Sequence, residues 1–294
     1  MSIDQIKNKK DFINHIMSQW ENYTNTYKKI ANYLLNNFVD VAFMTAKQWA
    51  KNAGTSEISV IRFVRFLGYD GYPHFVQKMH QIINKEMTMT DYLHISMKNR
   101  RIDNNVLLEI IKKEEQNFNQ LINKYSPKTI ENVLNLINEA ECLLIVGLRS
   151  SSCLAEYSEF IFSRVISKPI IKINVAGTTT YDLILPLEGK KVLALFFGYP
   201  RYPSKTIEIL HFVKKMNWPI ISITNDETSP LVPLSDYVIY APANSVSFTD
   251  SMSTPIVMIN TIVLEYIYKF HDQAIEKIKR FEEIAKEFNY YYHY

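Results

Sequence analysis

The sequence predicts two domains: an all-α domain that contains a helix-turn-helix, then a three-layer α/β domain with a five-stranded parallel sheet. Three observations lead to this prediction. Residues 1–86 carry apolar side chains at the three-to-four spacing of amphipathic helices. From residue 142, nearly continuous apolar runs alternate with helical segments, as in a parallel sheet covered on both faces. Residues 87–105 are polar and irregular, so they are expected to be a linker that leaves 106–294 for the second domain.

The bulk composition is that of an ordinary globular protein. A length of 294 residues suits two domains, and a hydrophobic content of 47% with 21% charged residues indicates folded chain. No apolar run could span a bilayer, and the N-terminus lacks the apolar core of a secretory signal. Cys142 and Cys153 form no CxxC pair, and both are expected to be packed thiols. A cytoplasmic location and no membrane partner are therefore expected.

Positive charge is concentrated near the N-terminus. Residues 1–100 hold 13 Lys and Arg against 8 Asp and Glu, a net charge of +5, whereas the whole chain carries +3 and the remainder therefore −2. A basic first third joined to a slightly acidic larger part points to a polyanionic partner for the first domain.

The elements of the second domain follow in order. Two helical stretches come first, and in the second Ser126 can cap and Pro127 suits the first helical position. Helices within 103–140 are expected to transmit changes between the domains. Five apolar runs are then expected to be strands: CLLIVG, PIIKIN, KVLALFFG, PIISITN and DYVIYAP. One long helical pattern, from about 252 to 288, closes the chain.

Residues 49–72 have the spacing of a helix-turn-helix. The first helix needs a small residue where the second crosses it, the turn needs a residue that tolerates left-handed backbone angles, and the second helix needs an apolar residue that faces back. Ala50, Gly54 and Val60 fill these three positions, and Trp49 and Phe63 can close the sides of the same core.

The outward face of the second helix is polar and basic. Ser56 is expected to cap this helix, with Glu57 in its first turn. Serine and arginine side chains suit base edges and phosphates in a major groove. The predicted DNA-contacting residues are Lys47, Ser56, Glu57, Ser59, Arg62 and Arg65. The alternative is a structural helical hairpin with solvated arginines.

The segment FMTAKQWAKNAGTSEISVIRFVRFLGYDGYPHF resembles the N-terminal domain of the RpiR family of bacterial transcription regulators. The residues that carry the resemblance are Ala50, Ala53, Gly54, Ser56, Val60, Arg62, Phe63, Arg65, Leu67, Gly68, Tyr69 and Gly71. The resemblance implies a DNA-binding regulator whose partner is a double-stranded operator.

Two loops of the predicted sheet qualify as an anion site. Ligands of open parallel sheets bind outside the carboxyl ends of strands, where the strand order reverses. One loop follows Gly147 and the other follows Gly198, and both lead into helices whose N-terminal N–H groups attract anions. The candidate ligand-binding residues are Arg149, Ser150, Ser151, Arg201, Ser204 and Thr206. Helix capping is the alternative role of these serines.

Residues 107–270 resemble a sugar isomerase (SIS) domain, with a flavodoxin-like fold. The family pattern has Gly-x-Gly-x-Ser in the first loop and Ser-x-Ser-Gly-x-Thr in the second, and both grip a phosphate. Here Arg149 replaces the second glycine, and the second loop lacks its Ser-x-Ser. A phosphosugar is the implied effector, although another small anion would also suit two arginines. The TDSMSTP segment is expected to line the pocket from the other side, and a domain that only dimerises is the alternative.

The sequence therefore predicts a regulator rather than an enzyme. The predicted loops carry no Glu–His pair for isomerisation, and seven scattered histidines have no metal-binding spacing. No cofactor, no metal and no catalytic residue is expected. A homodimer or a dimer of dimers is expected, because one recognition helix buries little surface on DNA. The alternative function is a sugar-phosphate isomerase of the SIS type with an accessory helical domain.

Overall fold

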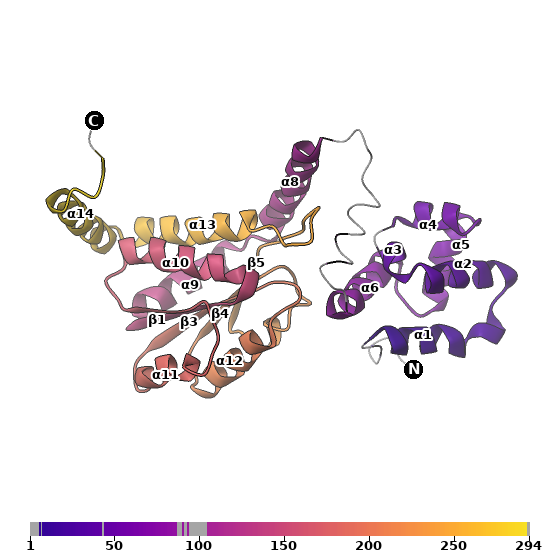
Figure 1. The fold of residues 1–294 in the computed structure, drawn as a ribbon, viewed down its shortest axis with the longest axis horizontal. Coiled ribbons are helices and arrows are strands. Elements are labelled where there is room, and N and C mark those ends of the chain that lie inside the picture. Colours follow the sequence, from indigo (N-terminus) through magenta and orange to yellow (C-terminus); the bar gives the residue numbers. More distant parts are fainter. Residues whose placement is uncertain are drawn as a thin grey trace. The chain divides into compact units, whose positions relative to one another are not determined.

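The computed structural model describes residues 6, 8–42, 44–86, 90, 93 and 105–292. The chain divides into two compact units, residues 1–100 and 101–294 (Figure 1). The predicted linker lies outside the described residues except at positions 90, 93 and 105. No helix of the described part is long and apolar enough to cross a bilayer.

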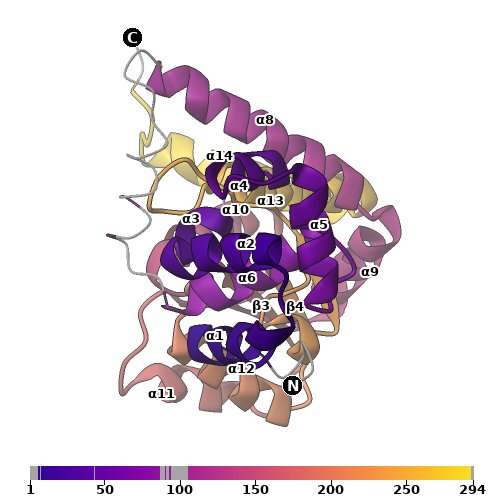
Figure 2. The same cartoon turned by 90° about the vertical axis from the view of Figure 1, so that its right-hand side faces the viewer.

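All regular elements in the described residues of the first unit are helices, as predicted. Its elements are α1 (Lys9–Ser18), a 3-10 turn (Trp20–Asn22), α2 (Asn25–Asn36), α3 (Phe38–Ala42), α4 (Ala46–Asn52), α5 (Glu57–Phe66) and α6 (Tyr72–Glu86). Aromatic side chains dominate its core: the Trp49 and Phe75 rings stack with centroids 5.4 Å apart, and the ring of Phe12 meets that of Phe38 edge-on at 5.3 Å. This core holds α4 and α5 against each other (Figure 2).

The second unit contains the five predicted strands in one parallel sheet. The strands are β1 (Cys142–Gly147), β2 (Ile170–Ile173), β3 (Val192–Gly198), β4 (Ile220–Thr224) and β5 (Tyr237–Tyr240). Their order is β2-β1-β3-β4-β5, and all four pairings are parallel. β2 lies on one side of β1, whereas β4 and β5 lie on the far side of β3. The strand order therefore reverses between the neighbours β1 and β3.

Helices cover both faces of this sheet (Figure 1). The helices are α8 (Val106–Lys124), α9 (Pro127–Glu139), α10 (Ser152–Val165), α11 (Thr180–Ile184), α12 (Ser204–Lys215), α13 (Ser253–Lys269) and α14 (His271–Glu287). Along β1 the side chains alternate: Leu143 and Ile145 pack with α9, α10 and α13, whereas Leu144 and Val146 pack with α12. Both faces of the strand are apolar because both are covered.

The C-terminal helical pattern is two helices rather than one. The break falls at Phe270, whose backbone (φ −119°, ψ 46°) is not helical. Its N–H still donates to the Tyr266 carbonyl at 2.8 Å, and its ring packs 4.9 Å from the Tyr266 ring. The apolar periodicity continues across this residue, so the pattern alone gave no sign of the break.

Candidate DNA-binding face and effector-binding edge

The turn between α4 and α5 has the predicted helix-turn-helix geometry. Gly54 has φ +64°, and no atom lies within 4 Å of where its Cβ would stand, so the backbone angle rather than crowding favours glycine. The N–H of Thr55 donates to the Ala50 carbonyl at 2.9 Å, which closes the end of α4 in a Schellman-type turn.

The small core behind this turn is also as predicted. Trp49, Val60 and Phe63 have no exposed surface, and Ala50 is 3% exposed. The rings of Trp49 and Phe63 meet nearly perpendicularly with centroids 6.2 Å apart. These contacts fix how α5 leaves the turn, and therefore which of its side chains point to solvent.

The Ser56 side chain caps α5, as predicted. The Ser56 Oγ accepts a hydrogen bond from the Ser59 N–H at 3.2 Å and lies 2.8 Å from the Ser59 Oγ. The Ser59 side chain is half-buried, and its hydroxyl already has Ser56 as a partner. The other predicted DNA-contacting side chains are exposed: Lys47, Ser56, Glu57, Arg62 and Arg65. Among the described residues, Lys47 and the two arginines have no ion-pair partner.

One further side chain of α5 faces solvent. Ile58 is 63% exposed, which is unusual for a large apolar side chain on a short, otherwise well-packed helix. Sequence reasoning passed over this residue because the polar neighbours were used to define the outward face. An apolar side chain in this position can contact a thymine methyl group.

At the other unit, the two predicted ligand loops lie side by side. They follow β1 and β3, which are hydrogen-bonded neighbours with Gly147 paired to Phe197, so both loops leave the carboxyl edge of the sheet at the point of strand reversal. A Cβ at Gly147 would stand 2.4 Å from the Ser151 carbonyl oxygen. Glycine therefore lets the loop after β1 fold back tightly onto the strand end.

Each loop contains an arginine with a left-handed backbone. Arg149 has φ +58° and Arg201 has φ +59°, and both side chains are exposed. This conformation costs a non-glycine residue about 1–2 kcal/mol. Arg149 occupies the position where the SIS pattern has its second glycine, so the backbone shape is retained and a guanidinium is added.

The helices that follow these loops begin without a side-chain cap. Ser151 precedes α10 and Pro203 precedes α12, and neither makes a side-chain hydrogen bond to its helix. Capping therefore does not explain the serines at these positions. The hydroxyl of Thr206, the third residue of α12, is buried and has no hydrogen-bond partner among the described residues. Part of each N-terminus is already used, because the N–H groups of Ser151, Ser152 and Thr206 donate to the carbonyl oxygens of Leu148, Arg149 and Pro203. The donors left for an anion are the remaining N–H groups, the two arginine side chains and the unsatisfied Thr206 hydroxyl.

The six predicted ligand-binding residues differ in accessibility. Arg149, Ser150, Arg201 and Ser204 are exposed, whereas Ser151 and Thr206 are buried. The prediction that both cysteines are packed is wrong for one of them. Cys142 is buried in β1, but Cys153 is exposed in the first turn of α10, and both are free thiols. A small depression elsewhere, between α8, α9 and β5, is lined by none of the predicted ligand residues.

Sequence reasoning quoted the TDSMSTP segment without singling out its carboxylate. Asp250 is half-buried, and burial raises the pKa of its carboxyl to about 7, against a smaller opposing effect of Arg201. The pKa of Tyr199 and that of Tyr202 are both raised, first by burial and also by the Asp250 charge. Asp250 therefore lies within electrostatic reach of the loop after β3.

Comparison with known families assigns both units. Residues 10–86 match the helix-turn-helix domain of the rpiR family, and residues 136–265 match the SIS domain. An uncharacterized HTH-type transcriptional regulator of Thermotoga maritima is 24% identical, over 95% of this chain and all of that protein. A second HTH-type regulator, from Clostridium perfringens, is 23% identical over 89% of this chain and 95% of its own.

Two solved structures share the fold. The sugar isomerase domain of an RpiR transcription factor from Sphaerobacter thermophilus superposes with a TM-score of 0.58 at 19% identity, covering 61% of this chain and 99% of that one. The NanR protein of Vibrio vulnificus, solved with ManNAc-6P, covers 94% of this chain and 98% of its own, with a TM-score of 0.54 at 18% identity. The two units thus define a helix-turn-helix transcriptional regulator with a SIS domain. The chain belongs to the RpiR family.

Proposed function

We propose that α5 enters the major groove of an operator. In this arrangement Ser59 and Arg62 face base edges, Arg65 and Lys47 face phosphates, and Ile58 approaches thymine methyl groups. The basic side chains are exposed and have no ion-pair partner within the described part of the chain, which supports this assignment, because such groups can bind a polyanion without breaking internal contacts. Ser56 and Glu57 lie at the N-terminus of the same helix.

The proposed assembly is a homodimer or a dimer of dimers. One recognition helix contacts only a few base pairs, so two helices on half-sites about one helical turn apart are needed for useful affinity. Analytical ultracentrifugation with and without a duplex tests this assembly, and a monomer bound singly to DNA would contradict it.

The proposed effector is a small anion, and a phosphosugar is the first choice. The observation that carries this proposal is the pair of uncapped helix N-termini, α10 and α12, beside two arginines at the strand-reversal edge. The partnerless Thr206 hydroxyl adds a donor that a phosphate oxygen would satisfy. NanR, which shares this fold, was solved with ManNAc-6P.

One experiment tests the regulator as a whole. The full chain is screened for thermal stabilisation by a panel of sugar 6-phosphates, and each compound that raises the Tm is then titrated into a gel-shift with a duplex selected from a random library. We expect one compound to change operator affinity by about 5- to 150-fold. Arg201→Ala should abolish the Tm shift and leave basal DNA binding unchanged. A wild-type chain that no compound stabilises would favour a SIS domain that only dimerises.

The second candidate function is sugar-phosphate isomerisation. Asp250 favours it, because a half-buried carboxyl with a pKa near 7 suits a general base. The names of the relatives point instead to regulation. A coupled isomerase assay on the compounds that bind distinguishes isomerisation from regulation. Turnover by the wild type that is lost in Asp250→Asn would support isomerisation.

A further inference from the structure

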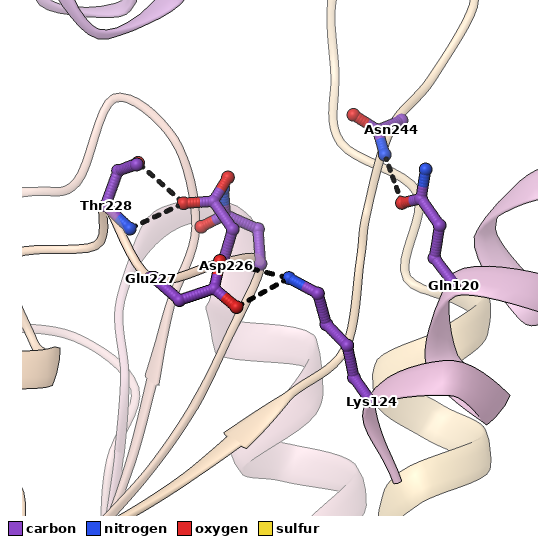
Figure 3. A network of polar contacts seen from close by, with 7 residues as sticks. Gln120, Lys124, Asp226, Glu227, Thr228 and Asn244 are labelled. Atoms are coloured by element: carbon purple, nitrogen blue, oxygen red, sulfur yellow. Dashed lines mark hydrogen bonds and ion pairs between the residues drawn. The ribbon is translucent and has the colours of Figure 1, made fainter. Parts of the chain in front are cut away.

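Helix α8 is fixed to the segment between β5 and α13 by a reciprocal amide pair. Asn117 has no exposed surface, and its Nδ2 donates to the Asn244 carbonyl at 2.8 Å. In return, Asn244 Nδ2 donates to Asn117 Oδ1 at 3.1 Å. Figure 3 shows a further contact of the same amide, to Gln120 Oε1 at 3.5 Å. Because Asn117 is fully buried, its amide has no water to replace a lost partner, and the pair defines one position of α8 on this segment.

A second attachment joins the end of α8 to the segment after β4. The Lys124 ammonium lies 3.0 Å and 3.1 Å from the two carboxylate oxygens of Glu227, as Figure 3 shows. The neighbouring Asp226 accepts a hydrogen bond from Asn225, and Asn225 in turn accepts one from the Tyr202 hydroxyl at 2.5 Å. Tyr202 follows directly after Arg201, so this chain of contacts begins in the loop after β3.

The segment held by Asn244 folds back on itself, since the Ser251 N–H donates to the Ala243 carbonyl at 2.9 Å. The Tyr199 hydroxyl donates to the Ala241 carbonyl at 3.2 Å, which ties the start of this segment to the loop after β3 as well.

We propose that residues 241–252 are an effector-reading segment that transmits effector binding to α8, through the Tyr199–Ala241 contact at one end and the Asn117–Asn244 amide pair at the other. This inference rests on the proposed effector site and adds one role to it. The Asn117–Asn244 pair couples the site to the helix that leads back toward the DNA-binding unit.

The coupling has a definite thermodynamic form. An effector can change operator affinity only if it interacts differently with two states of the protein. We expect the two states to differ in how the effector-reading segment holds α8. Breaking the amide pair should then leave both operator binding and effector binding intact, and should remove the effect of one on the other. This separates a coupling residue from one that supports the fold or contacts a ligand.

The test targets the amide pair. Asn244→Ala removes an exposed side chain, and Asn117→Ala removes the buried partner. In both variants we expect operator affinity without effector, and effector affinity by calorimetry, within about threefold of wild type. The change in operator affinity caused by the most stabilising sugar 6-phosphate should fall from 5- to 150-fold to below about twofold. Gln120→Ala, which loses only the 3.5 Å contact, is the matched control and should couple normally. Wild-type coupling in both asparagine variants would overturn the coupling role.

Calorimetry of the wild type with the same sugar 6-phosphate separates this inference from the proposed effector site. If the wild type does not bind the compound, the effector site itself is wrong, which is a different result from normal binding with unchanged coupling.

Discussion

The helices of the two units begin in different ways, and the difference separates two modes of recognition. In the first unit α1, α2, α4 and α5 are each closed by a side-chain oxygen, from Asn8, Thr24, Thr45 and Ser56 respectively. In the second unit α8 and α9 are closed in the same way by Asn105 and Ser126. The two helices that follow the predicted ligand loops, α10 and α12, have no such cap.

A side-chain cap satisfies one of the N–H groups at a helix start, so a capped helix has fewer free backbone donors than an uncapped one. We therefore expect α5 to contact DNA through its exposed side chains, whereas the proposed effector site would also use backbone N–H groups of α10 and α12, which most side-chain substitutions leave in place. Four predictions test this contrast, beginning with the largest expected effect.

Arg62→Ala should abolish specific operator binding and leave the fold intact. Each bidentate Arg–guanine contact contributes about 1–3 kcal/mol, so a dimer that loses two should lose about 2–6 kcal/mol. Gel-shift titration against a random-sequence duplex measures the specific part. Lys10→Ala, an exposed substitution on α1, is the control and should bind normally. Full operator affinity in Arg62→Ala would remove α5 from the recognition role.

Asp250→Asn should change how stability depends on pH. Burial raises the pKa of Asp250 from 3.8 to about 7, so between about pH 4 and pH 7 the folded chain holds a proton that the unfolded chain has released. Stability therefore falls as pH rises through this range, by on the order of 2–4 kcal/mol from this group. Asparagine cannot ionise and should remove the loss. Urea unfolding at pH 4 and pH 8 measures it, and a variant with the same pH dependence as wild type would show that the carboxyl is not buried in this way.

Ser56→Ala and Ser204→Ala form a matched pair across the two kinds of helix start. The first removes a cap and should cost about 1 kcal/mol. The second removes an exposed hydroxyl that caps nothing, and its stability change should stay within about 0.5 kcal/mol. Thermal unfolding compares them. Equal costs would mean that the N-terminus of α12 is closed by its own side chains after all.

Arg149→Gly should separate stability from binding. Glycine relieves the left-handed backbone strain, for a net gain of about 0.5–1 kcal/mol after its greater freedom in the unfolded chain is subtracted. Effector affinity should nevertheless fall, because a guanidinium donor is lost. Asn217→Gly, at φ +55° just after α12, is the control and should gain less, since asparagine tolerates this conformation. An Arg149→Gly variant that is less stable would show that the guanidinium holds the loop.

The fold was predictable because its signals are local. The five strands are apolar runs with clear ends, and the spacing of Ala50, Gly54 and Val60 predicts the helix-turn-helix. The break at Phe270 was not predictable, since it depends on backbone angles that no residue type there demands. The exposed face of α5 was predicted correctly at Ser56, Glu57, Arg62 and Arg65, whereas Ser59 is half-buried and the exposed Ile58 was missed because its exposure contradicts its type.

The candidate site was harder to predict because it is assembled from loops that are far apart in the sequence. Arg149 and Arg201 could be proposed from their place after glycines, but their left-handed backbones could not. Asp250 and the partner of Asn117 lie far from these loops along the chain, and no spacing rule joins Asn117 to Asn244. Such contacts exist only after the sheet has brought the strand ends together, so they belong to tertiary structure.

The exposed thiol of Cys153 has a practical consequence. With Cys142 buried in the sheet, a maleimide dye would attach at one position of the native chain without any engineered cysteine. That position is the first turn of α10, next to the loop that carries Arg149, so the attached fluorophore would sense local polarity there. The labelled wild-type protein would thus report ligand binding at the proposed effector site by a change in fluorescence, which can be followed at equilibrium and by stopped-flow.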